Sequence, residues 1–198
     1  MTGGYNILLS IKSIVLKNDV DIELLPVCKH EQYLRDMHEY SKLDEFYQYL
    51  EFDSFQSLEE TGAYLHSLID RSMLGTGQYW FIYLPLEDVV VGTIGLHSLD
   101  TNRLSSEVGF GLSPHYQGRG IFSKALKLVL NHGFLDLGLI RIAARTDVNN
   151  TGSIKGLVRN GFTQEGVMRK YYRYVSEQRY SDCVLLSKLS SDYGTEKL

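Results

Sequence analysis

The chain has 198 residues and a mass of 22.6 kDa, which suits one domain with a full core and is small for two. Its 20 Lys and Arg against 24 Asp and Glu give a net charge of −4, so no overall charge favours nucleic acid or an anionic membrane. No apolar run approaches the roughly 20 residues that a membrane-spanning helix needs. The first residues also lack the pattern of a secretory signal, so we expect a cytoplasmic protein.

Cysteine and histidine spacing argues against a metal site. Cys28 and Cys183 lie far apart and form no CxxC pair, which excludes a disulfide framework and a structural zinc site. The six histidines are scattered without ligand spacing, so we expect no metal. The 14 tyrosines indicate a groove lined by aromatic rings in addition to a core.

The first half of the chain predicts strands, then helices, then a meander. Alternating apolar residues predict strands over 7–14 and 20–24, joined by a turn at 17–19. Helical spacing predicts two short helices within 29–49, and Ser57 with Glu60 forms a capping-box pattern that opens a helix to about Met73. Three strands over 78–84, 89–99 and 104–112 follow, and their short connections predict an antiparallel meander.

The second half predicts one helical crossover and a closing hairpin. A loop over 114–120 leads to a helix over 121–137, a strand over 140–146 and a helix over 153–159. Because a helix connects strands 104–112 and 140–146, that pair should be parallel. Strands over 162–174 and 179–189 close the fold, and the polar tail 190–198 is expected to fray. We expect a single domain over 1–198, with its core at about 20–189.

A strand that ends in a glycine-containing turn and then opens a helix spans residues 107–121. This geometry directs backbone N–H groups and the positive end of a helix toward one point, which favours a phosphate group. Gly118 and Gly120 allow close approach of a ligand, and Arg119 adds a positive charge. For the loop alone, the alternative is a turn that only redirects the chain.

Two common phosphate loops are excluded. The string G-x-x-x-x-G-K-[ST] of a Walker loop does not occur. A dinucleotide fingerprint that begins with Gly109 and Gly111 would need a third glycine where Pro114 lies. The preceding strand also belongs to a meander and not to the first unit of a doubly wound sheet.

The segment Gln117-Gly118-Arg119-Gly120-Ile121 resembles the Q/R-x-x-G-x-G/A loop of the GNAT superfamily of acyl-CoA N-acyltransferases, with Phe122 at the last small position. Asn150-x-x-Ser153, Gly161-Phe162, Glu165-Gly166-x-x-Arg169 and Tyr180-x-Asp182 are similar to the RimJ/RimL-like branch, which acetylates protein N-termini. The similarity covers about residues 20–189. It implies an α/β (α+β) domain whose mixed, mostly antiparallel sheet has about seven strands flanked by helices and splays at a parallel pair.

The resemblance implies direct transfer of an acetyl group from acetyl-CoA to a neutral amine, without a covalent intermediate. Gly109 and Gly111 within a strand predict a bulge or a close approach that splays the sheet. A backbone N–H near Phe110 would polarise the thioester carbonyl, and the strand would pair with the amides of pantetheine. The residues expected to bind acetyl-CoA are Val108, Gly109, Phe110, Gln117, Gly118, Arg119, Gly120, Ile121, Asn150 and Ser153.

Three residues are candidates for proton transfer. Glu107 lies where related enzymes carry a glutamate that acts through water, and the alternative is a solubilising surface residue. Ser153 would protonate the departing thiolate, since position 157 holds Leu where many relatives have Tyr; the alternative is a helix cap. Asn150 likewise either contacts CoA or caps that helix. Tyr172 stands where the branch often has a carboxylate and is a candidate base.

The acceptor is expected between the early helices and the closing hairpin. An α-amine, with a pKa of about 7.7–8.0, needs far less help than an alkyl amine near about 10.4, so a protein N-terminus, such as that of a ribosomal protein, is the leading acceptor. A small-molecule amine (polyamine, amino sugar or antibiotic) and a catalytically silent acyl-CoA-binding module are the alternatives. No nucleic acid or membrane partner is expected, and a homodimer is a possible assembly. The candidate acceptor residues, each also explicable as solvated or core, are Asp44, Glu45, Phe46, Tyr49, Glu51, Phe52, Asp53, Tyr171, Tyr172 and Tyr174.

Overall fold

A computed structural model describes residues 14–17 and 21–193. Its centre is a single sheet in the strand order β1-β2-β3-β4-β5-β6-β8-β7, in which every neighbouring pair is antiparallel except β5 and β6. The predicted fold class is confirmed, with eight strands in place of about seven. The strands are β1 (Leu16–Lys17), β2 (Glu23–Pro26), β3 (Gly77–Leu84), β4 (Val89–Asp100), β5 (Ser105–Leu112), β6 (Arg141–Asp147), β7 (Thr163–Tyr174) and β8 (Arg179–Leu189).

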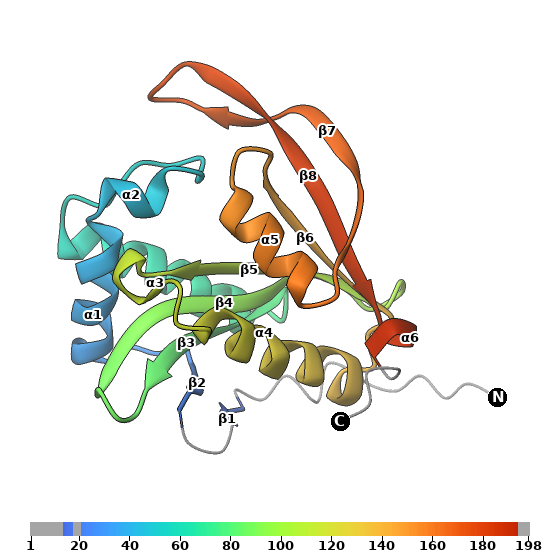
Figure 1. Ribbon diagram of the computed structural model, residues 1–198. Helices are drawn as coiled ribbons and strands as arrows, with labels where there is room; N and C mark the ends of the chain where they lie inside the picture. The colour runs from blue at the N-terminus through green and yellow to red at the C-terminus, as the bar shows by residue number, and fades with distance from the viewer. Residues whose placement is uncertain (1–13, 18–20, 194–198) are drawn as a thin grey trace.

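Helices cover both faces of the sheet (Figure 1). Figure 1 shows α4 and α5 in front of the sheet and α3 behind it, while the β7–β8 hairpin extends beyond the other strands. None of the helices within 14–17 and 21–193 combines the length and apolar character needed to cross a bilayer. The helices are α1 (Glu31–Ser41), α2 (Asp44–Tyr47), α3 (Leu58–Met73), α4 (Ile121–Asn131), α5 (Thr151–Arg159) and α6 (Ser190–Tyr193).

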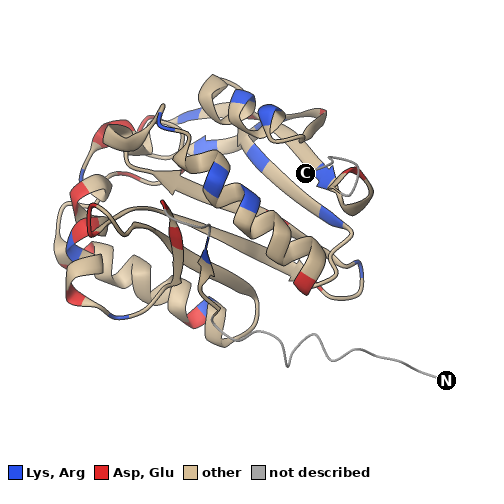
Figure 2. Ribbon diagram, turned by 60° about the horizontal axis from the view of Figure 1, so that its bottom comes forward, with Lys and Arg blue, Asp and Glu red and all other residues tan. Residues whose placement is uncertain are grey.

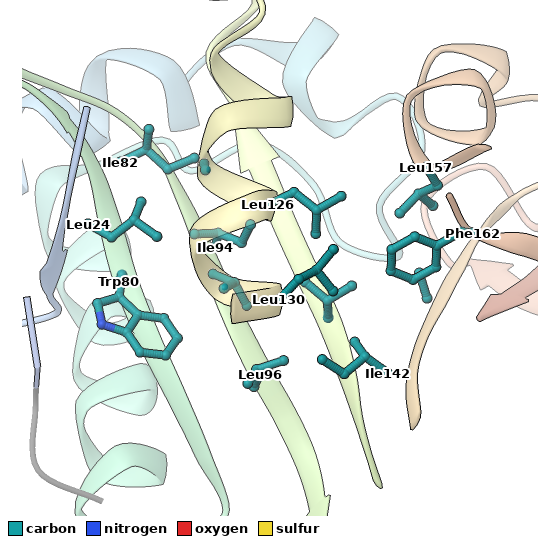
Figure 3. Packing of buried hydrophobic residues seen from close by; sticks show 14 of the residues in the cluster. Leu24, Trp80, Ile82, Ile94, Leu96, Leu126, Leu130, Ile142, Leu157 and Phe162 are labelled. Atoms are coloured by element: carbon teal, nitrogen blue, oxygen red, sulfur yellow. The ribbon is translucent and has the colours of Figure 1, made fainter. Parts of the chain in front are cut away.

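Two hydrophobic clusters, one on each face, hold these layers together. Because alternate strand residues point to opposite faces, Trp80 and Ile82 join the cluster under α4 and α5, whereas Phe81 joins the cluster under α1 and α3. Figure 3 shows Leu126 and Leu130 of α4 directed at the sheet. The central strands are therefore buried on both sides, and the functional groups must lie at their ends or in a gap.

Several element boundaries follow from side-chain hydrogen bonds. Ser57 caps α3 as predicted, since its hydroxyl accepts from the Glu60 N–H at 3.2 Å. The expected helix over 121–137 ends instead at Asn131 and continues as a π-helical turn, His132–Asp136. This wider turn places the buried His132 ring between the Asp136 carboxylate and the Gln78 amide oxygen, each 2.8 Å away.

The two ends of the chain depart from the prediction. Ser190–Tyr193 forms α6 rather than a frayed tail, because the Tyr193 ring packs against Phe134 at 5.1 Å between centroids. Residues 194–198 lie outside the described residues. Of the strand expected over 7–14, residues 7–13 also lie outside them, and Ile14 precedes the first strand. The turn expected at 17–19 falls mostly on residues 18–20, which are likewise not described.

The parallel pair β5–β6 is short. Only Ser105–Glu107 pairs with Arg141–Ala143; beyond these residues β5 stays paired with β4, and β6 with β8. The predicted splay is therefore confirmed. The predicted bulge at Gly109 and Gly111 is wrong: both glycines keep regular pairing with β4, and the register shifts between His97 and Asp100.

Candidate active site

A cavity of about 360 Å³ lies at the point where β5 and β6 diverge. Its wall includes strand residues on both sides of the gap, helices α1 to α3 from one face, and the start of α5 from the other. The lining residues from the strands and the α5 region are Tyr79, Thr93, Ile94, Gly95, His97, Val108, Gly109, Phe110, Gly111, Arg145, Thr146, Asn150, Ser153 and Tyr172. The gap thus joins the two faces of the sheet, which is the arrangement that a two-substrate transfer reaction requires.

Glycines form the floor of the cavity on the α1–α3 side. An ideal Cβ on Gly111 would lie 2.6 Å from the Phe46 ring, and one on Gly109 would lie 3.2 Å from the His97 ring. These distances are shorter than normal van der Waals contact, so a side chain at either position would displace an aromatic ring. The close approach predicted for the two glycines is confirmed, and its function is to let aromatic rings lie directly on the strand.

The predicted phosphate loop has the expected open backbone. Gly118 and Gly120 both have φ of +75°, and an ideal Cβ on either would meet no atom within 4 Å. Gly120 is the N-cap of α4, so the first free N–H groups of the helix face open space. Gln117 donates weakly to the Leu112 carbonyl (3.5 Å), and Ile121 is buried, so Ile121 can offer only its backbone.

The position of Arg119 differs from what its expected role requires. Its guanidinium forms an ion pair with Glu87 and lies over the Tyr116 ring at 4.9 Å. Glu87 thus balances the positive charge of Arg119, which the sequence predicted would attract a phosphate. The backbone of the loop, rather than this side chain, is therefore the feature that is left open to an anion.

Phe122, which departs from the small residue of the family loop, has a matched space. Its ring lies 4.3 Å from the Phe110 ring, between centroids, and an ideal Cβ on Gly156 of α5 would approach it to 3.0 Å. Glycine on α5 therefore makes room for the bulky residue on α4. The departure leaves the helix start intact.

The cap of α5 is Asn150 and not Ser153. The Asn150 side-chain oxygen accepts from the Ser153 N–H at 3.0 Å and caps α5. Ser153 is therefore the capped residue and not the cap, and both residues line the cavity. The positive N-terminal end of α5 lies at the same place.

Glu107, the candidate base on β5, is held in an ion pair. Its carboxylate binds the Arg145 guanidinium of β6 at 2.5 Å, and it is absent from the residues that line the cavity. Its cross-strand neighbour His97 does line it. Burial lowers the pKa of His97 below its ordinary value, with Arg145 and Arg71 acting in the same direction against Glu107. Spacing alone did not single out His97, because its partner lies on another strand.

The aromatic residues of the hairpin take different positions. Tyr172 lines the cavity, and burial strongly raises its pKa, so its hydroxyl is a proton donor and not a base at neutral pH. Tyr171 lies under Arg145, 5.1 Å from its guanidinium carbon. Tyr174 is buried and donates to Asp147 at 2.6 Å, so it supports the hairpin.

The early segment closes one side of the cavity. Phe46, Tyr49, Glu51 and Phe52 line it, whereas Asp44, Glu45 and Asp53 do not. Glu51 accepts from the Arg173 N–H at 3.0 Å and Asp53 from the Ser176 hydroxyl at 2.6 Å, so the α2–α3 loop is tied to the β7–β8 hairpin. Asp44 accepts from Ser54. The expected acidic rim is thus largely engaged in internal hydrogen bonds.

Charge is distributed unevenly over the helices. The sequences of α4 and α5 contain lysine and arginine and no acidic residue. Figure 2 shows blue bands on these two helices, while red segments gather at the opposite end of the molecule. The α4–α5 side therefore suits an anionic ligand such as a nucleotide.

The family model described as an acetyltransferase (GNAT) domain matches residues 22–163. The chain belongs to this family. It is 29% identical to the N-acetyltransferase p20 of Bacillus licheniformis over 74% of this chain and 81% of that protein. It is 28% identical to the ribosomal-protein-serine acetyltransferase of Escherichia coli, over 58% of this chain and 63% of that protein. It is 25% identical to spermidine N(1)-acetyltransferase of Escherichia coli, over 60% of this chain and 63% of that protein.

Solved GNAT structures have the same fold. A structure of RimL, the ribosomal L7/L12 alpha-N-protein acetyltransferase, in complex with coenzyme A has a TM-score of 0.78 at 21% identity, over 89% of this chain and 98% of that one. The resemblance drawn from the sequence motifs is confirmed. The protein is an acetyl-CoA-dependent N-acetyltransferase of the GNAT family, with the cavity at the β5–β6 gap as its candidate active site.

Proposed function

We propose that this GNAT enzyme acetylates the α-amine of a peptide or protein N-terminus. The observation that carries the proposal is the charge of the cavity, whose lining includes one carboxylate, Glu51, and two arginines, Arg71 and Arg145. A polyamine carries several positive charges and would need several free carboxylates. An N-terminal α-amine carries one charge and loses it easily, since its pKa is about 7.7–8.0.

The alternative acceptor is a small amine, because one relative of this chain is a spermidine N(1)-acetyltransferase. The acidic residues that would bind such a molecule are already engaged: Glu51 by Arg173 and Asp53 by Ser176. Both bonds tie the α2–α3 loop to the β7–β8 hairpin, so a polyamine that drew these carboxylates into the cavity would compete with that connection. The rest of the lining combines aromatic rings, such as Phe46, Tyr49 and Phe52, with aliphatic and small residues, which suits the side chains of a peptide's first residues.

In this proposal the open loop at Gly118 and Gly120 binds the pyrophosphate of acetyl-CoA through backbone N–H groups. The free edge of β5 beyond Glu107 hydrogen-bonds the pantetheine, and the Phe110 N–H polarises the thioester carbonyl. Ser153, at the N-terminal end of α5, donates a proton to the departing thiolate, and Tyr172 is a second donor at the same cavity. Glu107, held by Arg145, keeps the charge of this region balanced.

The test is release of thiol from acetyl-CoA in the presence of N-terminal peptides, spermidine and an aminoglycoside, with the modified atom located by mass spectrometry. Acetylation confined to peptide α-amines is the expected result. Turnover on the small amines alone would overturn the proposed acceptor. Normal binding of acetyl-CoA with no turnover on any amine would favour the catalytically silent module.

A further inference from the structure

We propose that His97 is the catalytic base of this enzyme, taking a proton from the acceptor ammonium directly or through one water. Its ring lies on the floor of the cavity, on β4, against Gly109 of the splayed strand. The inference requires that the acceptor is an amine, as it is for an N-acetyltransferase. It rests on the proposed function only where the acceptor is taken to be an α-amine.

The two ring nitrogens of His97 have different surroundings. Nδ1 lies 3.2 Å from the Ser98 hydroxyl, while Nε2 lies 3.3 Å from the point where a Cβ would stand on Gly109. With the Nδ1 proton donated to Ser98, Nε2 carries the lone pair and can accept a proton. Glycine at 109 is what leaves Nε2 uncovered, because any side chain there would lie in its path.

Three further features fix the position of His97. Its carbonyl accepts from the buried Ser106 hydroxyl at 2.7 Å, and its backbone pairs with Glu107 on one side and Gly77 on the other. The next residue, Ser98, has a φ of +53°, in the left-handed region that a non-glycine residue seldom adopts. Strained backbone of this kind persists where the surrounding structure holds it, and it gathers at functional sites.

The charges that face the ring come from every neighbouring strand and helix. Glu107 of β5 faces it together with Arg145 of β6, which binds that carboxylate, and Arg71 approaches from α3. On β3, the Tyr79 ring lies over Gly77, opposite His97. Burial and the two arginines hold the imidazole neutral at pH 7, the form that a base requires. Glu107 remains an anion nearby and stabilises the imidazolium once it forms.

Each proton in the proposed reaction has an acceptor among the residues of the cavity or in water. Nε2 of His97 takes one proton from the acceptor ammonium, and the freed amine nitrogen bonds to the thioester carbonyl carbon. The carbon–sulfur bond breaks, and the second proton lost by the nitrogen ends on the thiolate by way of Ser153 or Tyr172. His97 then releases its proton to water. One amide, one CoA thiol and one proton are formed.

The experiment compares the His97→Gln and Glu107→Gln variants with wild type, using whichever amine the wild type acetylates. We expect kcat/KM of His97→Gln to fall about a hundredfold, with an unchanged KM for acetyl-CoA. Its pH profile should lose the limb that wild type shows on the acid side. His66→Gln, on the exposed face of α3, is the matched control and should retain full activity. Exogenous imidazole should restore part of the activity of His97→Ala.

Activity of His97→Gln within threefold of wild type, with the acid limb intact, would overturn the inference. Loss of the limb in Glu107→Gln alone would assign the base to that carboxylate instead. The wild type provides a test that does not depend on a variant folding: the NMR titration of the His97 ring must give the same pKa as the kinetic limb. These outcomes differ from a failure of the proposed function, which would change the accepted amine and leave the His97 comparison in place.

Discussion

His97 and Glu107 are direct partners across β4 and β5, but Arg145 binds only the glutamate. The pair therefore contains one charged residue that is already neutralised and one residue that lines the cavity. Arg145 contacts one and the same oxygen of Glu107 twice, through Nη2 at 2.5 Å and Nε at 2.7 Å, so the glutamate is held beside the guanidinium. This relationship is one reason why we propose His97 of β4, and not Glu107 of β5, as the base.

We predict that Gly120→Glu raises the KM for acetyl-CoA at least tenfold, a loss of about 1.4 kcal/mol in binding. The variant places a carboxylate and a Cβ at a residue with φ of +75° at the start of α4. Gly138→Glu is the matched control, since Gly138 also has positive φ and open space around it but lies outside the loop. Steady-state kinetics on both variants separates the two effects. An unchanged KM in Gly120→Glu contradicts the assignment of the loop.

We predict that Ser153→Ala lowers kcat while leaving KM and stability unchanged, whereas Asn150→Ala lowers stability by about 1 kcal/mol through loss of the α5 cap. The reason is that Asn150 accepts the capping hydrogen bond and Ser153 only donates its backbone N–H. Kinetics and urea denaturation of the two variants provide the measurement. Equal kcat in Ser153→Ala would leave Tyr172 as the donor to the thiolate.

We predict that Gly111→Ala destabilises the protein by about 1–3 kcal/mol, because its methyl group would overlap the Phe46 ring. The same substitution in a Phe46→Ala background should cost much less, which a double-mutant cycle by urea denaturation measures. Gly166→Ala, on β7, is the control, since nothing lies within 4 Å of an ideal Cβ there. Additive effects of Gly111→Ala and Phe46→Ala would show that the two residues are not in contact.

We predict a loss of stability below pH 4 that depends on Glu165. Hydrogen bonds from Arg141 and Ser187 lower the pKa of Glu165 to about 2 in the folded protein. Because the ordinary value is about 4.3, the ion pair stabilises the fold above that pH, and the stabilisation is lost as the pH falls toward 2. The carboxyl group is one-third exposed, so solvent screening limits the contribution to about 1 kcal/mol. The difference in unfolding free energy between wild type and Glu165→Gln should shrink from pH 6 to pH 3; a constant difference refutes the prediction.

Most of the fold was predictable because its signals are local. Alternation of apolar residues, the Ser57 cap and the glycines at 118 and 120 act within a few residues of the chain, and the structure places each as expected. The π-helical turn was not predictable, since it depends on His132 meeting Gln78 of a strand that lies 54 residues earlier. Likewise, α6 forms because Tyr193 finds Phe134.

The candidate site was predictable only in part for the same reason. Open glycine backbone at the start of α4 follows from sequence, whereas the pairing of Glu107 with Arg145 joins residues 38 apart through a parallel crossover. That His97 lines the cavity depends on its pairing with Glu107 across β4 and β5 and on the gap between β5 and β6, which no residue spacing encodes. The sequence nevertheless contained one signal. His97 is a titratable residue on the strand that comes before the strand leading into the glycine loop.

The short contact between β5 and β6 has a mechanical consequence. Among the described residues, strand pairing joins the sheet half β1–β5 to the half β6–β8 through three residue pairs, and beyond Glu107 the backbone of β5 on that side has no strand partner. Strand pairing is thus interrupted at this border, while β5 stays paired with β4 and β6 with β8. An extended ligand bound along this border would form hydrogen bonds where the two strands do not pair with each other. The amide hydrogens of β5 and β6 near the border should therefore exchange far more slowly once acetyl-CoA is bound.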